Sequence, residues 1–196
     1  MGSDGVRGIV LAGGKSTRFG RDKALARLDG VTFLERAVKL LRKLNLEPVV
    51  MTSRERDYSF LNCRIEKDLI PNCGPIGGLY TACLAFPNTS FLVLTCDMPG
   101  LTSFLLETLL MQHDRQNLVT LFCTSGNQTQ PFPGLYESRL SGSIKKEAIE
   151  KNKFSMHDFL STVPEKKLIR SEFSSNFFFN INTKEDMKSW TPSFKK

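Results

Sequence analysis

Glycines and cationic side chains are mixed in one short stretch near the start of the chain. Residues 11–24 read LAGGKSTRFGRDKA, and the cations among them are Lys15, Arg18, Arg21 and Lys23. Glycine has no Cβ, so at Gly13, Gly14 and Gly20 the backbone can turn sharply and bring its N–H groups against a ligand. Backbone amides and positive charge in one loop suit a polyphosphate. The stretch therefore predicts a phosphate-binding loop.

Two familiar phosphate-binding motifs do not match this loop. Gly14-Lys15-Ser16 supplies the end of a P-loop, but Ile9 stands where the first glycine of that motif belongs. The glycines also lack the Gly-x-Gly-x-x-Gly spacing of dinucleotide-binding folds. An ordinary solvated loop is the alternative. The cations, and the apolar residues 8–11 that predict a buried strand just before the loop, favour phosphate binding.

Asp97 is the first candidate for a metal ligand. It follows the apolar residues 91–95, which predict a short buried strand. Ligands of open α/β sheets bind outside the carboxyl ends of the strands, so Asp97 is expected at such a site. One carboxylate, with substrate phosphate and water, is a common way to hold Mg²⁺. The alternative is a helix cap or a solvated charge.

Further polar residues allow two interpretations each. Lys23 can reach phosphates or remain a surface lysine beside its neighbouring aspartate. Residues 74–78, GPIGG, can let a flat base lie against the backbone or form a tight turn before a helix. Asp68 lies in a polar loop, where a solvated charge is the simpler interpretation. Asn180 and Asn182 fall on one side of an expected strand, where they can bind a polar ligand or face water.

No protein nucleophile is indicated by the sequence. His157 and Asp158 are adjacent, so their side chains point apart. The five cysteines form no C-x-x-C pair and indicate reduced thiols, and only two histidines accompany them, which gives no ligand set for zinc. A phosphate-bearing acceptor can itself be the nucleophile, in which case the protein contributes position and charge neutralisation.

Strands and helices alternate along the chain. We expect strands at 8–11, 48–52, 91–95, 118–123 and 177–182, helices at 33–44, 82–86, 102–111 and 143–151, a stiff connection at 130–134 and a short last helix capped by Thr183. The alternation predicts a doubly wound three-layer α/β/α sandwich with a mostly parallel, Rossmann-like sheet. We expect one domain over 1–196, with a nucleotide-binding half at about 6–100 and an acceptor-binding half at about 101–190.

Composition and charge narrow the class of partner. The chain is 40% hydrophobic and 24% charged, which is typical of a globular protein, and its net charge of +7 favours anionic ligands. The cations cluster in the loop and around 145–170, without the basic stripe and stacking aromatics of a nucleic-acid binder. No segment has the form of a signal peptide or a membrane span. We therefore expect a cytoplasmic protein without nucleic-acid or membrane partners.

Several motifs together carry a family resemblance. Residues 11–24 resemble the signature loop LAGGxSxRxGxDKA of the nucleotidyltransferase superfamily that makes nucleoside-diphosphate sugars and related compounds. With GPIGG at 74–78, TCDMP at 95–99, QP at 130–131 and NINT at 180–183, the chain looks like the molybdenum cofactor guanylyltransferase family. The resemblance runs in order from about residue 8 to about residue 190, and implies transfer of GMP from GTP to the phosphate of molybdopterin, dependent on Mg²⁺, with release of pyrophosphate.

The resemblance also implies roles for individual residues. The expected nucleotide and acceptor contacts are Leu11, Ala12, Gly13, Gly14, Lys23, Ser53, Asp68, Gly74, Gly78, Asp97, Asn180 and Asn182. Lys23, Arg18 and Asp97 are expected to act in catalysis, with Asp97 on the metal and the asparagines on the pterin side. The basic helix near 145–153 is expected to receive the acceptor phosphate. Where the family often has Asn after the second strand, this chain has Thr52-Ser53.

Other functions share parts of this pattern. A cytidylyltransferase for the same acceptor has the same loop and the Cys-Asp-Met-Pro motif, and sugar-phosphate nucleotidyltransferases share the loop. A non-catalytic GTP-binding module would keep the loop but need not keep Asp97. Other proteins of cofactor biosynthesis are the expected partners.

Overall fold

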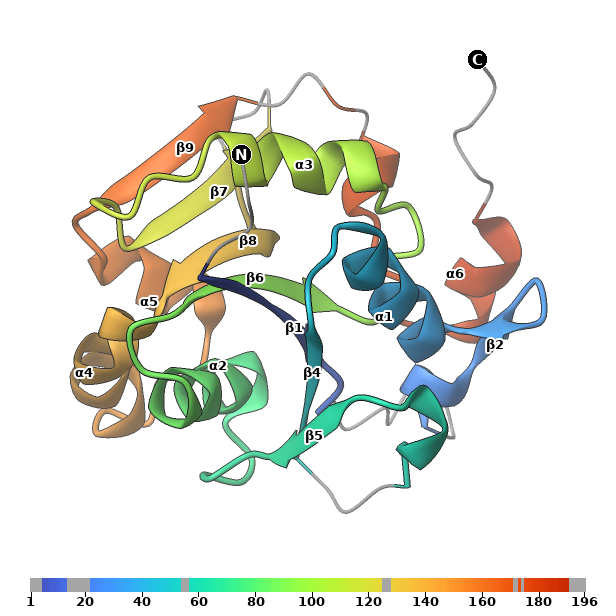
Figure 1. Ribbon diagram of the computed structural model, residues 1–196, viewed down its shortest axis with the longest axis horizontal. Helices are drawn as coiled ribbons and strands as arrows, with labels where there is room; N and C mark the ends of the chain where they lie inside the picture. Colours follow the sequence, from blue (N-terminus) through green and yellow to red (C-terminus); the bar gives the residue numbers. More distant parts are fainter. Residues whose placement is uncertain are drawn as a thin grey trace.

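A mostly parallel sheet forms the centre of the structure (Figure 1). The computed structural model describes residues 5–13, 22–53, 57–124, 128–170, 173 and 175–190. Within these residues the sheet has seven strands in the order β5 (Arg64–Lys67), β4 (Pro48–Thr52), β1 (Val6–Leu11), β6 (Ser90–Thr95), β8 (Thr129–Glu137), β7 (Val119–Cys123) and β9 (Lys166–Arg170). Pairing is antiparallel only at β8. The carboxyl ends of the other strands therefore share one edge of the sheet.

Helices cover both faces of this sheet. On one face lie α1 (Phe33–Lys43) and α3 (Ser103–Met111), and on the other lie α2 (Gly74–Ala85), α4 (Ser141–Ile144) with the π-helix η4 (Lys145–Ile149), and α5 (Met156–Thr162) (Figure 1). Along β1 and β4, Val10 and Val50 pack under α1, while Ile9 and Val49 pack under α2. This alternation is the period-two pattern of a sheet buried on both faces. The predicted three-layer α/β/α architecture is confirmed.

Local signals explain where several elements begin. Thr32 Oγ1 accepts a hydrogen bond from Glu35 N, and the Glu35 side chain accepts from Thr32 N, so a capping box starts α1. The hairpin of β2 (Arg27–Leu28) and β3 (Val31–Thr32) turns at Asp29 and Gly30, both with positive φ. Thr183 and Asp186 form a second capping box at α6 (Lys184–Ser189). Short 3₁₀ helices complete the chain: η1 (Lys23–Leu25), η2 (Ser59–Leu61), η3 (Ser138–Leu140) and η5 (Ser175–Phe178).

Two expectations about the later part of the chain are wrong. Residues 177–182 are not a strand: η5 occupies the first part, and the rest has irregular backbone. The reason is aromatic burial, because Phe178 packs 5.5 Å from the ring of Phe122 and Ile181 is fully buried. Residues 130–134 are not a separate connection but part of β8. Beyond these corrections, β5, β9 and α5 were not predicted at all.

A buried polar cluster lies at the amino edge of the sheet. Ser90 Oγ donates to Glu137 Oε1 at 2.6 Å, and His113 Nε2 lies 3.1 Å from Ser90 Oγ and 3.3 Å from Glu137 Oε1. Burial raises the pKa of Glu137, but the contacts from His113 and Ser90 outweigh burial and hold that pKa below its ordinary value of 4.5. The cluster joins β6, β8 and the segment after α3, at the edge opposite to Asp97. No helix among the described residues is long and apolar enough to cross a membrane.

Replacing Glu137 with Gln should destabilise the protein in a pH-dependent way. Because the folded-state pKa of Glu137 is lowered, its stabilisation is present above 4.5 and is lost as the pH falls through the folded-state pKa. We expect Glu137→Gln to lower the free energy of unfolding at neutral pH by about 1.5–3 kcal/mol, the size of a hydrogen bond to a charged group. Urea unfolding at neutral pH and at about pH 3 measures both values. Glu107→Gln, at an exposed position of α3, is the control, and an equal loss at both pH values would contradict the role of the Glu137 charge.

Candidate functional site at the carboxyl edge of the sheet

An ion pair joins the start of η1 to the end of β6. Lys23 Nζ donates to Asp97 Oδ2 at 2.7 Å, and the two side chains are only 15% and 18% exposed. The same ammonium group donates to Asn182 Oδ1 at 3.0 Å. Three residues that the sequence separates by 74 and 159 positions therefore meet at one point. This is the carboxyl edge, where ligands of α/β sheets bind.

The position of Lys23 is fixed by the residue before it. Asp22 caps η1, because its Oδ1 accepts from Ala24 N at 3.1 Å. Asp22 Oδ2 accepts from the hydroxyl of Tyr58 at 2.9 Å, and Tyr58 is 1% exposed. Ala24 is buried under α1. A buried tyrosine thus anchors the carboxylate that orients the turn carrying Lys23.

Asn182 is held by its own backbone contacts. Asn182 N donates to Asp186 Oδ2 at 2.8 Å, which is part of the capping box of α6. The residue before it, Ile181, donates its N–H to the carbonyl of Asp97 at 2.9 Å. The hydrogen bonds that the Asp186 carboxylate accepts, first the one from the Asn182 backbone and then those from Thr183, lower the pKa of Asp186. The C-terminal segment therefore meets the end of β6 through both its backbone and its Asn182 side chain.

Asp97 keeps one oxygen without a partner. Its Oδ1 is buried and accepts no hydrogen bond from any described residue. A buried carboxylate oxygen left unpaired is costly and is a position where a cation is favourable. No group of three His, Cys, Asp or Glu side chains suited to a metal ion occurs among the described residues. A metal at Asp97 would therefore need oxygen ligands from substrate or water, as Mg²⁺ commonly has.

A second carboxylate lies beyond the end of β5, in a cradle of glycines. Asp68 is tied to β4 by a hydrogen bond from its N–H to the Thr52 carbonyl at 2.9 Å. Its Oδ1 is buried with no partner among the described residues, and burial raises its pKa from 3.8 to about 6. A Cβ at Gly13 would lie 3.2 Å from Asp68 Oδ2, and one at Gly78 would lie 3.4 Å from Oδ1. The first strand and helix α2 thus approach Asp68 closely because both positions are glycine.

The neighbouring backbone is also tied down. Ala12 N donates to the Met51 carbonyl at 2.8 Å, which continues the pairing of β1 with β4 past Leu11. Ser53 Oγ donates to the Gly13 carbonyl at 2.5 Å, so the serine that follows β4 contacts the glycine loop directly. At Gly78 a Cβ would meet Leu11 Cδ2 at 2.8 Å, which any larger residue would have to displace.

The structure brings together most, but not all, of the predicted residues. Lys23, Asp97 and Asn182 form one group, and Leu11, Ala12, Gly13, Ser53, Asp68 and Gly78 form another at the same edge. Gly74 begins α2 with a φ of +57°, a left-handed conformation that favours glycine. Asn180 Nδ2 donates to the carbonyl of Phe178, and no contact joins its side chain to Asp97 or Asp68 among the described residues. Gly14 and Arg18 lie outside the described residues.

Some elements of the site were not foreseen from the sequence. Tyr58 donates its hydroxyl to Asp22, which lies far from it in the sequence. Asp186 accepts a hydrogen bond from the backbone N–H of Asn182. The capping motif at Thr183 did signal Asp186, but not its bond to Asn182. The predicted basic helix exists as α4 and η4, and Ile144 and Ala148 pack it into the core on the α2 face.

Comparison with known proteins agrees with this fold. A family model described as a MobA-like NTP transferase domain matches residues 8–164. The probable molybdenum cofactor guanylyltransferase of Flavobacterium johnsoniae is 32% identical over 181 residues, covering 91% of this chain and 93% of the relative. Two crystal structures share the fold. A protein of Aquifex aeolicus has a TM-score of 0.74 at 25% identity, covering 91% of this chain and 94% of its own. Molybdopterin-guanine dinucleotide biosynthesis protein A of Archaeoglobus fulgidus has a TM-score of 0.77 at 22% identity, covering 93% of this chain and 95% of its own.

These likenesses establish the class first: the fold and the matched domain are those of a nucleotidyltransferase. Within that class, the chain belongs to the MobA-like NTP transferase family. The resemblance read from the loop and the Cys-Asp-Met-Pro motif is confirmed.

Replacing Asp68 with Asn should stabilise the protein at neutral pH. Since burial raises the folded-state pKa of Asp68 to about 6 from 3.8, its ionised form opposes folding fully above pH 6 and no longer below 3.8. After discounting for partial solvent exposure, we expect a gain of about 1 kcal/mol in the free energy of unfolding at neutral pH. Urea unfolding across this pH range should show the gain shrinking toward zero as the pH falls.

Asp158→Asn, at an exposed position of α5, is the matched control and should show no such trend. An Asp68→Asn protein less stable than the parent at neutral pH would mean that the Asp68 carboxylate makes stabilising bonds in the free protein.

Proposed function

We propose that this chain transfers GMP from GTP to the phosphate of molybdopterin-type molybdenum cofactor and releases pyrophosphate. The relatives that match over nine-tenths of the chain are named probable molybdenum cofactor guanylyltransferases, which supports this choice of donor and acceptor. The observation that carries the proposal is the meeting of Lys23, Asp97 and Asn182 at the carboxyl edge. An acceptor phosphate oxygen forms a bond to the α-phosphorus of GTP, and the bond from that phosphorus to the bridging oxygen of the β-phosphate breaks.

Lys23 contributes positive charge to this reaction. Negative charge collects on the α-phosphate and on the leaving pyrophosphate as the bond breaks. The Lys23 ammonium is held by Asp97 and Asn182 and by the capped turn of η1, so little reorganisation is needed when phosphates arrive. Arg18 and Gly14, in the loop before it, are proposed to contact the same phosphates, together with Leu11, Ala12 and Gly13.

Asp97 is the proposed magnesium ligand. Its buried Oδ1, which has no hydrogen-bond partner among the described residues, fits a carboxylate that uses one oxygen for Lys23 and offers the other to a cation. Asp97 would hold Mg²⁺ here, and the ion would neutralise phosphate charge. The ion pair with Lys23 also keeps the carboxylate in place at the strand end.

Asp68 and the glycines around it are proposed to hold the guanosine. The Asp68 Oδ1 without a partner can accept a hydrogen bond from a nucleoside N–H or hydroxyl group. The missing side chains at Gly13 and Gly78 let the backbone come close on either side of Asp68. Ser53, which holds the Gly13 carbonyl, and Gly74 at the start of α2 complete this side.

The acceptor is proposed to bind on the C-terminal side of Asp97. Asn182 reaches the ion pair directly, and Asn180 lies two residues before it with an exposed side chain. The basic segment near 145–153 is proposed to receive acceptor phosphate. In this proposal the chain is one domain over 1–196, with the nucleotide half at about 6–100 and the acceptor half at about 101–190, and other proteins of cofactor biosynthesis supply and remove the acceptor.

The choice of nucleotide is tested by pyrophosphate release. We expect the purified protein with Mg²⁺ and molybdopterin to release pyrophosphate with GTP, and much more slowly with CTP or UTP. The dinucleotide product is identified by mass, which shows that the nucleoside monophosphate reached the acceptor. Turnover with CTP alone would show that the chain is a cytidylyltransferase and not a guanylyltransferase. GTP binding without turnover would show that it is a non-catalytic binding module.

Asp97→Asn should abolish turnover while leaving the fold intact. The variant can still accept a hydrogen bond from Lys23 but loses the charge that pairs with a cation. We expect kcat to fall by about 10²–10³-fold or more, while the circular dichroism spectrum of the folded protein is retained. Lys23→Ala should remove a few kcal/mol of transition-state stabilisation, which is measured from the fall in kcat/KM. Asp158→Asn is the control, and parent-like activity of Asp97→Asn across a Mg²⁺ titration would remove the metal role.

A further inference from the structure

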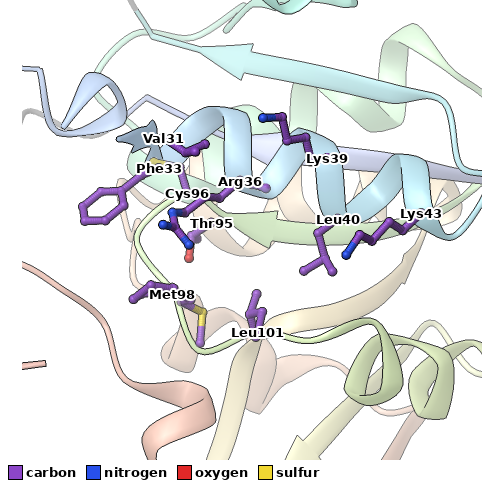
Figure 2. A pocket seen from close by; sticks show the side chains of 12 residues that line it. Val31, Phe33, Arg36, Lys39, Leu40, Lys43, Thr95, Cys96, Met98 and Leu101 are labelled. Atoms are coloured by element: carbon purple, nitrogen blue, oxygen red, sulfur yellow. The ribbon is translucent and has the colours of Figure 1, made fainter. Parts of the chain in front are cut away.

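A pocket lies outside the site described above, between α1 and the segment that follows β6. It has a volume of about 310 Å³ and is open to solvent on one side. Figure 2 shows Arg36, Leu40 and Lys43 of α1 on one wall, with Met98 and Leu101 on the opposite wall. Asp97 does not line it. The volume lies at the lower end of the range for small-molecule sites, which start at roughly 300 Å³.

The lining combines positive charge with apolar surface. Its charged residues among the described part of the chain are Arg36, Lys39 and Lys43, and no carboxylate lines it. The three cations follow one another along one side of α1 at spacings of three and four residues, so they lie on neighbouring turns. Leu40, Met98 and Leu101 supply apolar surface between them. A molecule that fits this lining has an anionic group and an apolar body.

Two polar groups of the pocket lack the partners that buried groups normally have. Arg36 Nε and Thr95 Oγ1 are almost fully buried, although the Arg36 side chain as a whole is 31% exposed, and neither atom has a hydrogen-bond partner among the described residues. The other end of the Arg36 guanidinium is fixed, because its Nη2 donates to the Leu28 carbonyl and to Asp29 Oδ2. Both groups line the pocket, and Figure 2 shows them toward the end away from Lys43. Arg36 Nε can donate to an anion, and the Thr95 hydroxyl can donate to it or accept from it.

We propose that this pocket binds a small organic anion, with its carboxylate, sulfonate or phosphate group at Arg36 and Thr95 and its apolar body between Leu40, Met98 and Leu101. Lys43 adds charge at the far end, so a dianion with separated charges fits as well. Charge complementarity selects an anion over a neutral compound, and the pocket volume selects a body smaller than a nucleoside triphosphate. The pocket is separate from the Lys23–Asp97 ion pair and from Asp68.

The proposal is tested with 8-anilinonaphthalene-1-sulfonate, an anionic aromatic dye. Titration is done in the presence of saturating GTP and Mg²⁺, so that the nucleotide site is occupied. We expect one dye molecule to bind, with a change in the methyl signals of Met98 and Leu101 in an NMR spectrum of methyl-labelled protein. Arg36→Gln should weaken this binding by about tenfold or more, because it removes the charge partner of the sulfonate. Lys43→Glu should weaken it by a similar factor, because it places a negative charge in the lining of a pocket that holds an anion.

Two variants keep the test decisive. Lys43 is exposed and its side chain makes no hydrogen bond or ion pair with any residue that the structure describes, so Lys43→Glu is expected to fold normally even if Arg36→Gln disturbs the β2–β3 hairpin. Lys188→Glu, the same charge reversal at an exposed position of α6, is the matched control and should leave dye affinity unchanged. Affinity that Lys43→Glu leaves unaltered, loss of binding in saturating GTP, or methyl shifts that miss Met98 and Leu101 would each overturn the proposal.

Discussion

The ion pair between Lys23 and Asp97 is the contact on which the carboxyl edge of this protein depends. It joins a 3₁₀ turn near the N-terminus to the end of the β6 strand, and Asn182 adds the C-terminal segment to the same ammonium group. Both charged side chains are largely withdrawn from water, so their mutual attraction is screened far less than that of a surface pair. Removal of either partner would leave the other charge poorly solvated. The segments are thus held by the same charges that are proposed to bind phosphate and metal.

The supports of this pair are themselves hydrogen-bonded, and they reach into the core. Tyr58 donates to Asp22, Asp22 caps the turn of Lys23, and Ala24 packs beneath α1. On the other side Asp186 holds Asn182, and Ile181 is buried beside Phe33 and Ala26. Each charged group therefore rests on a backbone position that packing fixes. This is the arrangement expected of a site that binds anions with little reorganisation.

The same edge carries groups that folding alone does not satisfy. Asp68 Oδ1 and Asp97 Oδ1 are buried without partners among the described residues, and burial raises the pKa of Asp68 to about 6. Unsatisfied buried polar atoms oppose folding, so stability alone does not account for them. The close approach of Gly13 and Gly78 to Asp68 belongs to the same picture, because any side chain at either position would fill the space beside the carboxylate.

The sequence predicted elements whose signals are local and missed those that depend on distant partners. Capping motifs at Thr32 and Thr183 located two helices, and apolar runs located the central strands. β9 reads KKLIR, with long cations where apolar residues were expected, because it is an edge strand. Pro131 and Pro133 argued against a strand, yet β8 accommodates them: its register with β7 jumps from Gly134 to Gln130, so the prolines fall in an irregularity where no ladder N–H is needed.

The residue types of the site could be chosen from the sequence, but their connections could not. Lys23, Asp97 and Asn182 were each candidates, while nothing local shows that one ammonium group binds both oxygens. The segment from Thr95 to Met98 takes part in both sites, because Asp97 contacts Lys23 while Thr95 and Met98 line the pocket beside α1. A ligand in the pocket that shifted this segment would also move Asp97, and any change it caused in substrate affinity at Asp97 would by linkage be matched by an equal change in pocket affinity when substrate binds. Residues 95–98 contribute to both the pocket and the ion-pair site, so a ligand that moves this segment at one site also moves it at the other.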